Sequence, residues 1–426
     1  MSAASTAAQP SAGPRPRSVA VIGAGIVGTC SALYLQREGF DVTLIERKQP
    51  GEACSHGNAG NLGIASCVPY STPGMLFKVP KLLLDPSGPL AVGPVHFFKA
   101  LPWFWRFIRA GKHERVEEIS DALRSLMARL KDAYDPLIQA AGAHNLIVQA
   151  GRIQVHESAA SMKGGEYGMD IRRRRGIAFD VLSGDEARRL EPALGPTVAG
   201  GYYIPEGSHC LNPGRFVKML AASFVRQGGR LVQADVKAFD LARAGAARMI
   251  TGGDPIDADA VVIAAGAWSK TLARQLGTRI PLQAERGYHS MLPNHAINLR
   301  IPITASDRFI TLTPMEEGLR VSGMGEFADP DAPAHFDYCR RMIGHAKKLL
   351  PGLNDAGAYD WMGPRPATPD GKPVIDRSAR HPWAYFAFGH GHVGLGTGAI
   401  TGRVISQLVA ARTPEVDLSP FAANRF

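Results

Sequence analysis

Apolar positions near the start of the chain predict a strand, a helix and a second strand in succession. Residues 18–23, SVAVIG, are almost entirely apolar, which is typical of a buried strand. A glycine-rich turn follows, and a helical pattern over 27–38 ends at Gly39, a natural C-cap. Residues 41–46, DVTLIE, predict the next strand. The start of the chain is therefore predicted to form one βαβ unit.

Similar patterns recur further along the chain. Residues 216–240 predict a helix, a Gly-Gly turn and a strand, and residues 257–277 predict a buried strand, a turn and a helix. Alternating polar and apolar positions over 280–330 favour an antiparallel sheet. From residue 361 the pattern predicts a turn, a strand, a glycine-rich turn and a final helix. These patterns favour a nucleotide-binding domain built from separated segments, with a second domain between them.

Composition narrows the class of protein. The chain of 426 residues is long enough for two or three domains, and its 45% apolar content supplies a sizeable core. Charged residues make up 20%, which is ordinary for a globular protein. The net charge of +10 suits nucleic acid, an anionic membrane surface or acidic substrates as partners, and equally a soluble protein with a basic surface. Five cysteines without zinc-type spacing favour a reducing compartment.

Targeting and membrane signals are weak. Residues 1–17 are rich in Ala, Ser, Pro and Gly and lack the apolar stretch of a secretory signal, so we expect a disordered tail. Two long uncharged stretches, 53–77 and 382–402, are too interrupted to predict a membrane span. Residues 76–140 are predicted to be helical, and 101–112, LPWFWRFIRAGK, suits a membrane contact or, with more weight, the core. We expect a cytoplasmic protein that is soluble or peripheral.

The turn after the first strand carries a dinucleotide-binding motif. Gly23, Gly25 and Gly28 match G-x-G-x-x-G, which allows a tight turn, close approach of the backbone to a pyrophosphate, and close helix packing. The helix N-terminus then faces the phosphates. Glu46, at the end of the next strand, is placed to accept hydrogen bonds from a ribose hydroxyl. Arg47 suggests NADP, but the charge of Glu46 would repel a 2′-phosphate.

Two further glycine turns belong with this motif. Residues 261–269, VVIAAGAWS, predict a buried strand that runs into a turn. Residues 389–402, GHGHVGLGTGAITG, lead into a helix whose N-terminus would stabilise negative charge on a reduced flavin ring. His390 and His392 have H-x-H spacing, but no cluster of carboxylates or cysteines accompanies them, so no metal site is assigned. Residues 171–176, IRRRRG, are interpreted as a solvated basic face.

Two segments offer candidate substrate contacts. Arg365, in GPRPATPDG, lies between two turns, where a fixed guanidinium would suit a carboxylate and a solvated loop charge is the alternative. Arg286 and Tyr288, in AERGYHSM, share one face of a predicted strand. His289 points the other way, and we expect a structural role for it.

Together these motifs resemble the FAD-dependent amine and D-amino-acid dehydrogenases of the D-amino-acid oxidase and glycine oxidase superfamily. The resemblance runs from about residue 19 to the C-terminus and rests on VIGAGIVGTCSALYL, SHGNAG, VVIAAGAWS, ERGYH, WMGPRPATPDGKPVI and FGHGHVGLGTG. The segments DPSGPL, LTPMEEGLRVSG, AKKLLP and SPFAANRF are most similar to the subgroup that includes glyphosate oxidoreductase and D-hydroxyproline dehydrogenase-like proteins.

The resemblance implies an α/β fold (α+β overall) with a discontinuous Rossmann-type FAD-binding domain and a substrate domain built on a mostly antiparallel sheet plus helices. The FAD-binding domain would comprise residues 18–80, 205–275 and 346–426. The substrate-binding domain would comprise residues 81–204 and 276–345.

The resemblance also implies which residues bind the cofactor FAD and the substrate. The positions that correspond to FAD contacts are Gly23, Gly25, Ile26, Val27, Gly28, Glu46, Arg47, Ser55, Asn58, Ala59, Gly60, Val236, Ala265, Gly266, Trp268, Gly363, Arg365, Gly391, His392, Val393, Gly394, Leu395, Gly396 and Thr397. The candidates for substrate binding are Arg365 as carboxylate anchor, Tyr288, Arg286, His390 and His56. No catalytic base is assigned, because hydride loss from a neutral amine requires none on the protein.

The implied activity is oxidative deamination of a D-amino acid or a secondary amino acid (D-proline, hydroxyproline or N-substituted glycine type) by hydride transfer to flavin N5. Electrons would pass to a quinone or another respiratory acceptor, with a peripheral contact on the inner face of a bacterial cytoplasmic membrane. An oxidase that uses O₂ and makes hydrogen peroxide is the alternative. Two alternatives of another class are a nucleic-acid-associated flavoprotein, prompted by the charge, and a NAD-binding regulator without chemistry. We expect no nucleic acid partner.

Overall fold

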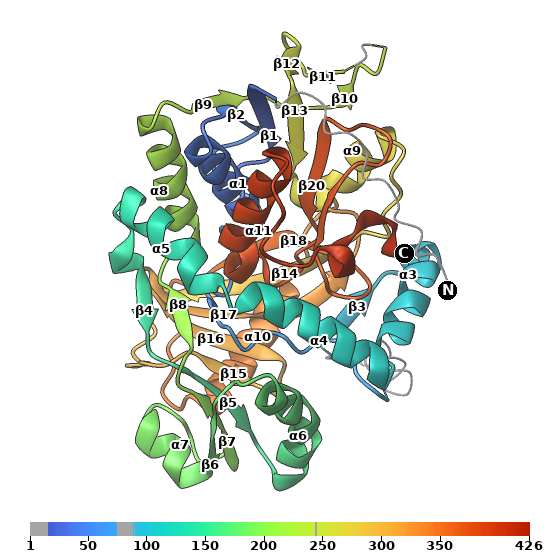
Figure 1. Cartoon of the computed structure of the whole chain (residues 1–426). Helices are drawn as coiled ribbons and strands as arrows, with labels where there is room; N and C mark the ends of the chain where they lie inside the picture. Colours follow the sequence, from blue (N-terminus) through green and yellow to red (C-terminus); the bar gives the residue numbers. More distant parts are fainter. Residues whose placement is uncertain (1–15, 75–87, 89, 243–244) are drawn as a thin grey trace.

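A computed structural model describes residues 16–426 of the chain, apart from 75–87, 89 and 243–244. Two large β-sheets organise these residues, one in the upper half and one in the lower half of Figure 1. Most of the predicted disordered tail, residues 1–15, lies outside the described part of the chain.

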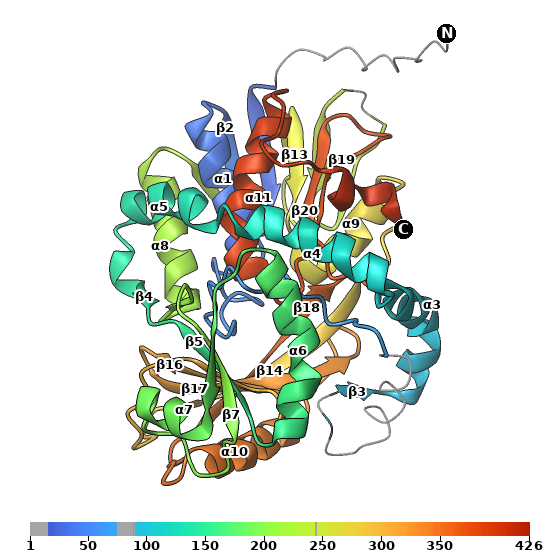
Figure 2. The same ribbon diagram turned by 60° about the horizontal axis from the view of Figure 1, so that its bottom comes forward.

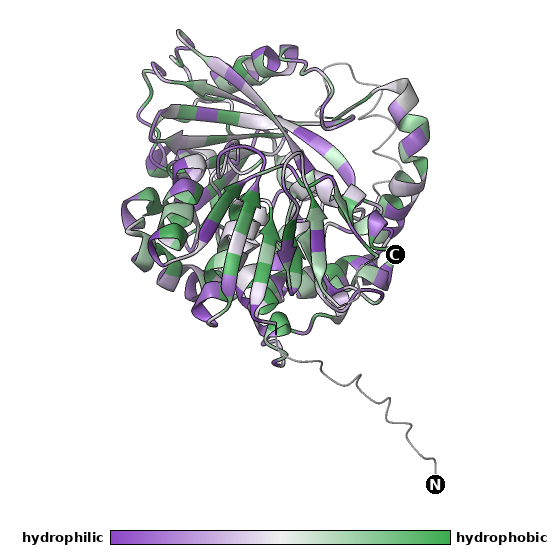
Figure 3. Ribbon diagram, turned by 90° about the horizontal axis from the view of Figure 1, so that it is seen from above, coloured by the Kyte–Doolittle hydropathy of each residue, from purple (hydrophilic) through white to green (hydrophobic). Residues whose placement is uncertain are grey.

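The upper sheet has six strands in the order β19-β20-β13-β1-β2-β9. Their bounds are β1 (Ser18–Ile22), β2 (Asp41–Glu46), β9 (Arg230–Gln233), β13 (Ala260–Ile263), β19 (Val374–Arg377) and β20 (Ala384–Phe388). Each neighbouring pair is parallel except β19 with β20. Hydrophobic residues predominate along the central strands in Figure 3, as expected of a parallel sheet covered on both faces. This is the arrangement of a Rossmann-type sheet.

Helices from distant parts of the chain pack together on this sheet. They are α1 (Ile26–Arg37), α4 (His113–Met127), α5 (Leu130–Ala141), α8 (Pro213–Arg226) and α11 (Gly394–Val409). α1 and α11 lie so close that a Cβ at Gly402 would be 2.6 Å from the carbonyl carbon of Cys30. Leu33, Val262 and Ile400 belong to the core that these helices and strands share.

The lower sheet has nine strands and is mostly antiparallel. Along the order β18-β14-β17-β16-β15-β5-β7-β6, with β3 on β17, only the pairs β15–β5 and β17–β3 are parallel. The bounds are β3 (Leu90–Val92), β5 (Arg152–His156), β6 (Asp180–Ser183), β7 (Gly200–Ile204), β14 (Gln283–Leu292), β15 (Ile303–Ala305), β16 (Ile310–Met315), β17 (Gly318–Phe327) and β18 (Tyr359–Ala367).

Helix α10 (Asp337–Leu349) packs against β14, β16 and β17. Figure 2 shows it on the side of the lower sheet that faces away from the six-stranded sheet. Ile153, Leu312 and Leu319 form the core between them. The other face of the lower sheet is therefore the one turned toward the Rossmann-type sheet.

Further helices and strands complete the described chain. They are α3 (Pro94–Ala110), α6 (Ala159–Arg174), α7 (Gly184–Leu190), α9 (Ser269–Gln275), the sheet of β10 (Ala238–Phe239), β11 (Ala247–Ile250) and β12 (Ile256–Ala258), the pair β4 (Ile147–Gln149) and β8 (Ser208–Cys210), and the 3-10 helices η1 (His144–Leu146), η2 (Gly266–Trp268), η3 (Ser419–Phe421) and η4 (Ala423–Arg425).

The predicted fold class is confirmed, while the packing differs from the expected domain boundaries in two places. β18 was expected within the FAD-binding domain, and it instead pairs with β14 in the lower sheet. α4 and α5 were expected within the substrate domain, and their apolar residues, including Leu126 and Leu137, join the core under α1 and α11. Both differences arise because an element belongs to the layer that buries its apolar face, whatever its place in the sequence.

Helix α3 divides the aromatic segment between core and surface. Trp103 and Phe104 are buried against Phe327 of β17. Phe98 and Trp105 are exposed, at 70% and 58%. The expectation of a core role is therefore met by part of the segment only. Within the described residues, no helix is long and apolar enough to cross a membrane.

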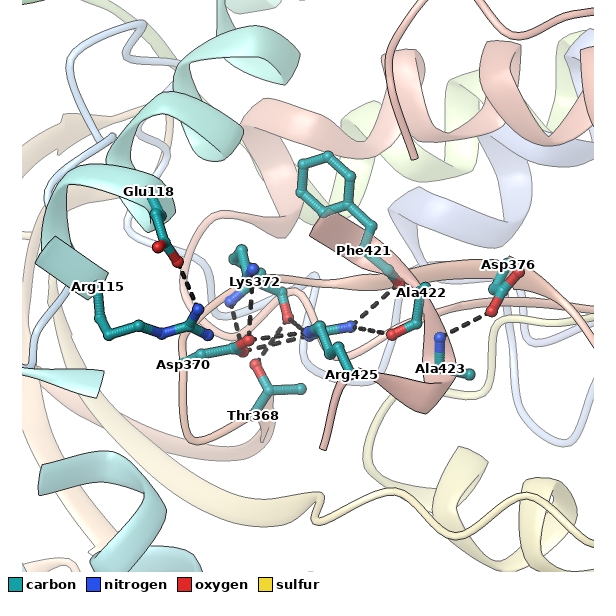
Figure 4. A network of polar contacts seen from close by, with 10 residues as sticks. All are labelled: Arg115, Glu118, Thr368, Asp370, Lys372, Asp376, Phe421, Ala422, Ala423 and Arg425. Atoms are coloured by element: carbon teal, nitrogen blue, oxygen red, sulfur yellow. Dashed lines mark hydrogen bonds and ion pairs between the residues drawn. The ribbon is translucent and has the colours of Figure 1, made fainter. Parts of the chain in front are cut away.

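Arg425, near the C-terminus, forms an ion pair and hydrogen bonds with the turn that follows β18 (Figure 4). Arg425 donates to Asp370, Nε to Oδ2 at 2.8 Å, and to the carbonyl of Lys372 at 2.7 Å. The Asp370 and Arg425 side chains are each 9% exposed. Because this turn continues the strand that carries Arg365, the chain's end stabilises a segment next to the candidate site.

Candidate active site

The glycine-rich turn after β1 depends on the absence of side chains at two positions. Gly23 has φ 103°, a conformation that L side chains rarely adopt, and a Cβ there would be 2.6 Å from the carbonyl oxygen of Ala264. A Cβ at Gly28 would be 1.8 Å from the carbonyl oxygen of Gly23. The loop after β1 and the first turn of α1 can pack this closely only because residues 23 and 28 are both glycine.

Glu46 and Ser55 flank this turn. Oε2 of Glu46 accepts a hydrogen bond from the backbone N–H of Ala24 at 2.7 Å. Oγ of Ser55 accepts one from the N–H of Ile26, in the first turn of α1, at 3.0 Å. The end of β2 and the loop after it are thereby drawn to the N-terminus of α1.

The lower sheet holds the next residues of that loop. Arg320 of β17 donates to the carbonyl oxygens of His56, at 3.1 Å, and Asn58, at 2.5 Å. The hydroxyl of Thr313, on β16, donates to the carbonyl of Ala59 at 2.9 Å. Side chains of the lower sheet thus fix the backbone of the SHGNAG segment. These hydrogen bonds could not be predicted from the sequence, because each joins residues more than 250 positions apart.

A cleft of about 1510 Å³, open solvent included, follows the carboxyl ends of the parallel strands. It extends from residues 234–237, after β9, past the glycine turn to His390 and Gly394 near the start of α11. In open α/β sheets, the carboxyl ends of the strands are where dinucleotides bind.

FAD fits the chemistry of this cleft. Gly25, the N-cap of α1, has no side-chain cap, and the first turn of α1 contains no acidic residue. The first turn of α11 also lacks an acid and a side-chain cap, and Gly394 and Leu395 line the cleft. Two helix N-termini therefore offer N–H groups and positive dipole ends to a pyrophosphate and to the electron-rich end of a flavin.

The predicted cofactor contacts divide into two sets. Those that line the cleft are Gly23, Gly25, Ile26, Val27, Glu46, Arg47, Ser55, Asn58, Val236, Ala265, Gly266, Trp268, Gly391, Gly394 and Leu395. Those outside its described lining are Gly28, Ala59, Gly60, Gly363, Arg365, His392, Val393, Gly396 and Thr397. Gly28 lies beneath the turn, and Thr397 is fully buried within α11.

Other lining residues were missed in the sequence. Cys54 and Asp331 are two of them. Asp331 reaches the cleft from the chain between β17 and α10, and its Oδ2 accepts a hydrogen bond from Nε1 of Trp268 at 3.2 Å. The guanidinium of Arg47 lies 3.8 Å from the centre of the Trp268 ring. Lone polar residues in loops give no periodic signal, so only the packing could identify them.

Beside the cleft lies an inner recess, which we define by the side chains of Cys54, Tyr70, Arg152, Arg365 and His392. Tyr70 is 57% exposed, yet burial raises its pKa to about 12. Burial likewise raises the pKa of Cys54 to about 11 and lowers that of His392 to about 3.

The five side chains act on one another. The rings of Tyr70 and His392 have centroids 4.2 Å apart. Charge on Arg365 affects the pKa values of Cys54, Tyr70 and His392, and charge on Arg152 affects those of Tyr70 and His392. The recess joins the cleft, because Cys54 belongs to both and the neighbours of Arg365, Pro364 and Pro366, line the cleft.

Arg365 is the predicted carboxylate anchor, and the structure gives it an acidic partner. It lies opposite Glu285 in the pairing of β18 with β14, and its Nη1 donates to Oε1 of Glu285 at 2.8 Å. Gly287 makes room for it, since a Cβ there would be 2.3 Å from Nη2 of Arg365. Within the described chain, Nε and Nη2 make no hydrogen bond, so one edge of the guanidinium is available to a ligand.

Arg286 and Tyr288, expected to contact the substrate, are both turned toward Glu326. Both side chains are buried and both donate to Oε2 of Glu326, Arg286 Nε at 2.8 Å and the Tyr288 hydroxyl at 2.5 Å. Arg286 also donates to the carbonyls of Ala332 and Pro333. They share one face as predicted, but that face is packed inside the protein, where they hold the chain that carries Asp331.

The four histidines singled out in the sequence do not converge. His390, a candidate for substrate binding, is buried and lines the cleft, and its Nε2 lies 3.0 Å from the Thr401 hydroxyl. His56 lies beside Trp361 and outside the described lining, which differs from the expected substrate contact. His289 stacks on Trp361, as a structural residue would. No group of three potential metal ligands occurs among the residues that the structure describes.

The discontinuous Rossmann-type sheet, the glycine turn and the cleft define a two-domain, dinucleotide-dependent class of enzyme. A family model described as "FAD dependent oxidoreductase" matches residues 18–408, and the chain belongs to this family, abbreviated DAO. FAD is therefore its cofactor, and the protein is an FAD-dependent oxidoreductase. The resemblance inferred from the motifs is confirmed.

Individual relatives span the whole chain. It is 38% identical over 420 residues to a D-amino-acid oxidase of Bradyrhizobium diazoefficiens, covering 97% of this chain and 100% of that protein. It is 30% identical over 429 residues to a D-amino acid dehydrogenase of Rhizobium johnstonii, covering 96% and 99%. Among solved structures, glycine oxidase from Geobacillus kaustophilus shares the fold, with a TM-score of 0.76, 20% identity and coverage of 97% and 99%.

Proposed function

We propose that this protein oxidises a D-amino acid or a secondary amino acid, of the D-proline, hydroxyproline or N-substituted glycine type, at the carbon that carries the amine. The observation that carries the proposal is the free edge of Arg365 in a desolvated recess beside the cofactor cleft. A guanidinium edge matches a carboxylate with two parallel hydrogen bonds. The names of the two curated relatives support the same substrate class.

FAD, when bound, supplies the two-electron acceptor that takes hydride from the amine-bearing carbon. The chain's own part is to bind and orient the substrate. Arg365 would hold the α-carboxylate, and Glu285 fixes the guanidinium in place. The rings of Tyr70 and His392, in contact with each other, would form one wall of the recess around a bound substrate. Such fixed positioning accounts for much of the rate acceleration in reactions of this kind.

No side chain of the recess is in a state to take a proton readily at neutral pH. Burial keeps the Tyr70 phenol and the Cys54 thiol protonated, and the pKa of His392 near 3 makes its ring a poor base. This supports leaving the catalytic base unassigned. The substrate amine would react in its neutral form, and water would then convert the imine product to a keto acid and ammonia or an amine.

A screen of D-amino acids, cyclic imino acids and N-substituted glycines tests the proposal, with bleaching of the flavin absorbance in the absence of oxygen as the readout. We expect D-amino or secondary amino acids to bleach the flavin. Arg365→Ala, with FAD still bound, should raise the apparent dissociation constant of these substrates by about 10- to 100-fold, the worth of a charge-assisted hydrogen bond. Unchanged affinity in that variant would contradict the carboxylate role.

We propose a quinone or another respiratory carrier as the electron acceptor. The second candidate is O₂, which the name of the relative from B. diazoefficiens favours. Steady-state assays of the same preparation with a soluble quinone and with O₂ separate the two. Rapid quinone reduction with little hydrogen peroxide supports the first, and stoichiometric peroxide supports the second.

We further propose that the exposed face of α3 contacts an anionic membrane surface. Phe98, Leu101 and Trp105 are spaced for one face of the helix and are all exposed. Lys99 and Arg109 lie among them and add positive charge. Binding to anionic vesicles that weakens in Phe98→Ser/Trp105→Ser and in high salt is expected, and equal binding by this variant would contradict the proposal.

A further inference from the structure

Arg152, the first residue of β5, is a cation that has no partner among the described residues. Within the described chain its guanidinium makes no hydrogen bond and no ion pair, and its Nε is buried and unsatisfied. Leaving a charged group in this state is unfavourable unless something else supplies the missing contacts. An arginine of this kind is a candidate for a ligand site.

Other inward-facing arginines are satisfied by the protein itself. Arg365 has Glu285, and Arg286 has Glu326. Arg172, whose charge lowers the pKa of Arg152, donates to the carbonyls of Ala65 and Gly168. Arg365, Arg286 and Arg172 are thus each paired with an acid or with carbonyl groups of the protein. Arg152 is the exception among these four arginines.

The surroundings of Arg152 are aromatic and cationic. The ionisable groups that alter its pKa are Arg172 and Tyr70, and neither is an acid. Burial lowers the pKa of Arg152 to about 10, so the guanidinium still carries its charge at neutral pH. Glu285, the described carboxylate that acts on Cys54 and Tyr70, is engaged by Arg365.

Arg152 and Arg365 both lie near enough to the Tyr70 and His392 side chains to act on them. Both affect the pKa values of Tyr70 and His392, whose rings are in contact. One arginine comes from β5 and the other from β18, at separate positions in the lower sheet. A ligand in the recess would therefore meet two cations on separate strands, only one of which is compensated by an acid of the protein.

We propose that Arg152 binds a second carboxylate of the substrate, so that the preferred substrates are amino acids with two acid groups, the second on the side chain or on the nitrogen substituent. This inference rests on the proposed function, in which Arg365 holds the α-carboxylate. The planar fork of Arg152 would accept the second carboxylate with two hydrogen bonds, and its unsatisfied Nε would gain a partner.

Equilibrium binding to the FAD-loaded protein tests the inference without turnover. Acetate, malonate, succinate and glutarate are titrated against the flavin absorption spectrum, which changes when an anion enters the recess. We expect at least one dicarboxylate to bind about 10- to 100-fold more tightly than acetate, the range for one added charge-assisted contact. Equal affinities for acetate and all three dicarboxylates would overturn the proposal.

Two variants and a control locate the effect. Arg152→Gln should remove the preference for the dicarboxylate over acetate, while Arg152→Lys should retain part of it, because the charge remains without the fork. Arg173→Gln, which removes a charge that is 62% exposed on α6, is the matched control and should behave as wild type. FAD content and thermal stability establish that each variant is folded. A dicarboxylate preference that survives in Arg152→Gln would overturn the assignment.

Kinetics separate this inference from the proposed function. If acidic or N-carboxymethyl amino acids reduce the flavin with kcat/KM at least about tenfold above neutral amino acids, and Arg152→Gln reverses the order, both stand. If neutral amino acids react equally well and Arg152→Gln changes nothing, the inference fails and the proposed function stands. If no amino acid reduces the flavin, the proposed function fails, and the dicarboxylate titration still decides whether Arg152 binds an acid.

Discussion

Arg365 and Glu285 lie directly opposite each other on β18 and β14, and Nη1 of Arg365 donates to Oε1 of Glu285 at 2.8 Å. Their side chains are 22% and 16% exposed, so the pair is mostly shielded from water. The acid holds the guanidinium in position and also reduces the positive charge that a substrate carboxylate would meet. Stability and anion affinity should therefore respond to its removal in opposite directions.

Glu285→Gln tests this relationship. The variant should be less stable than the wild type, by about 1–3 kcal/mol, because a shielded arginine loses its partner. It should bind acetate several-fold more tightly, since the competing carboxylate is gone. Urea unfolding and acetate titration of the flavin spectrum measure the two quantities. Weaker acetate binding in a folded, FAD-loaded variant would show that Glu285 is needed to shape the anion site.

Gly28→Ala should abolish FAD binding. The added Cβ would lie 1.8 Å from the carbonyl oxygen of Gly23, a backbone atom that cannot move without opening the turn. Gly164→Ala is the matched control, because a Cβ at that helical position meets nothing within 4 Å. The ratio of flavin to protein absorbance after purification is the readout. Full FAD content in Gly28→Ala would contradict the role assigned to this glycine.

Arg425→Met should lower the free energy of unfolding by about 3–5 kcal/mol, because it leaves the shielded carboxylate of Asp370 without its main partner. Lys372, 3.8 Å from Asp370, can compensate only in part. The double variant Asp370→Asn/Arg425→Met should recover some of the loss. Chemical unfolding of the three proteins measures it, and equal stability of Arg425→Met and wild type would contradict the prediction.

The protein should become less stable as the pH falls from about 6.5 toward 4, because burial lowers the pKa of His289 to about 3. An unfolded histidine titrates near 6.5, so in this window the unfolded state binds more protons than the native state. The free energy of unfolding therefore decreases as the pH is lowered. His289→Phe keeps a ring on Trp361 and removes the titration. Its melting temperature should depend less steeply on pH between 4 and 6.5 than that of the wild type, and identical slopes would contradict this prediction.

The features of the fold that could be predicted from the sequence are those that depend on a few neighbouring residues. The spacing of Gly23, Gly25 and Gly28 follows from steric limits within one short turn, and the apolar runs of β1 and β13 follow from burial on both faces of a sheet. Both act over a few residues, so both are visible in the chain. The position of Glu46 at the cleft was predicted in the same way, from the number of residues between it and the glycine turn.

Contacts between distant residues were outside the reach of such patterns. Arg286 and Tyr288 were expected to share a face, and they do, but only the packing of Glu326 beside them shows that this face is closed. The allocation of β18 to the lower sheet depended likewise on which partner strand was free to pair.

The sequence by itself determined a dinucleotide turn, a discontinuous Rossmann-type domain and, through its motifs, an FAD-dependent family, because each rests on short-range sterics and burial. Only the tertiary structure decided which charges are compensated. Arg365 has Glu285, 80 positions away, whereas no carboxylate of the described residues acts on Arg152. Electrostatic pairing depends on separation in space, which the order of residues along the chain does not specify.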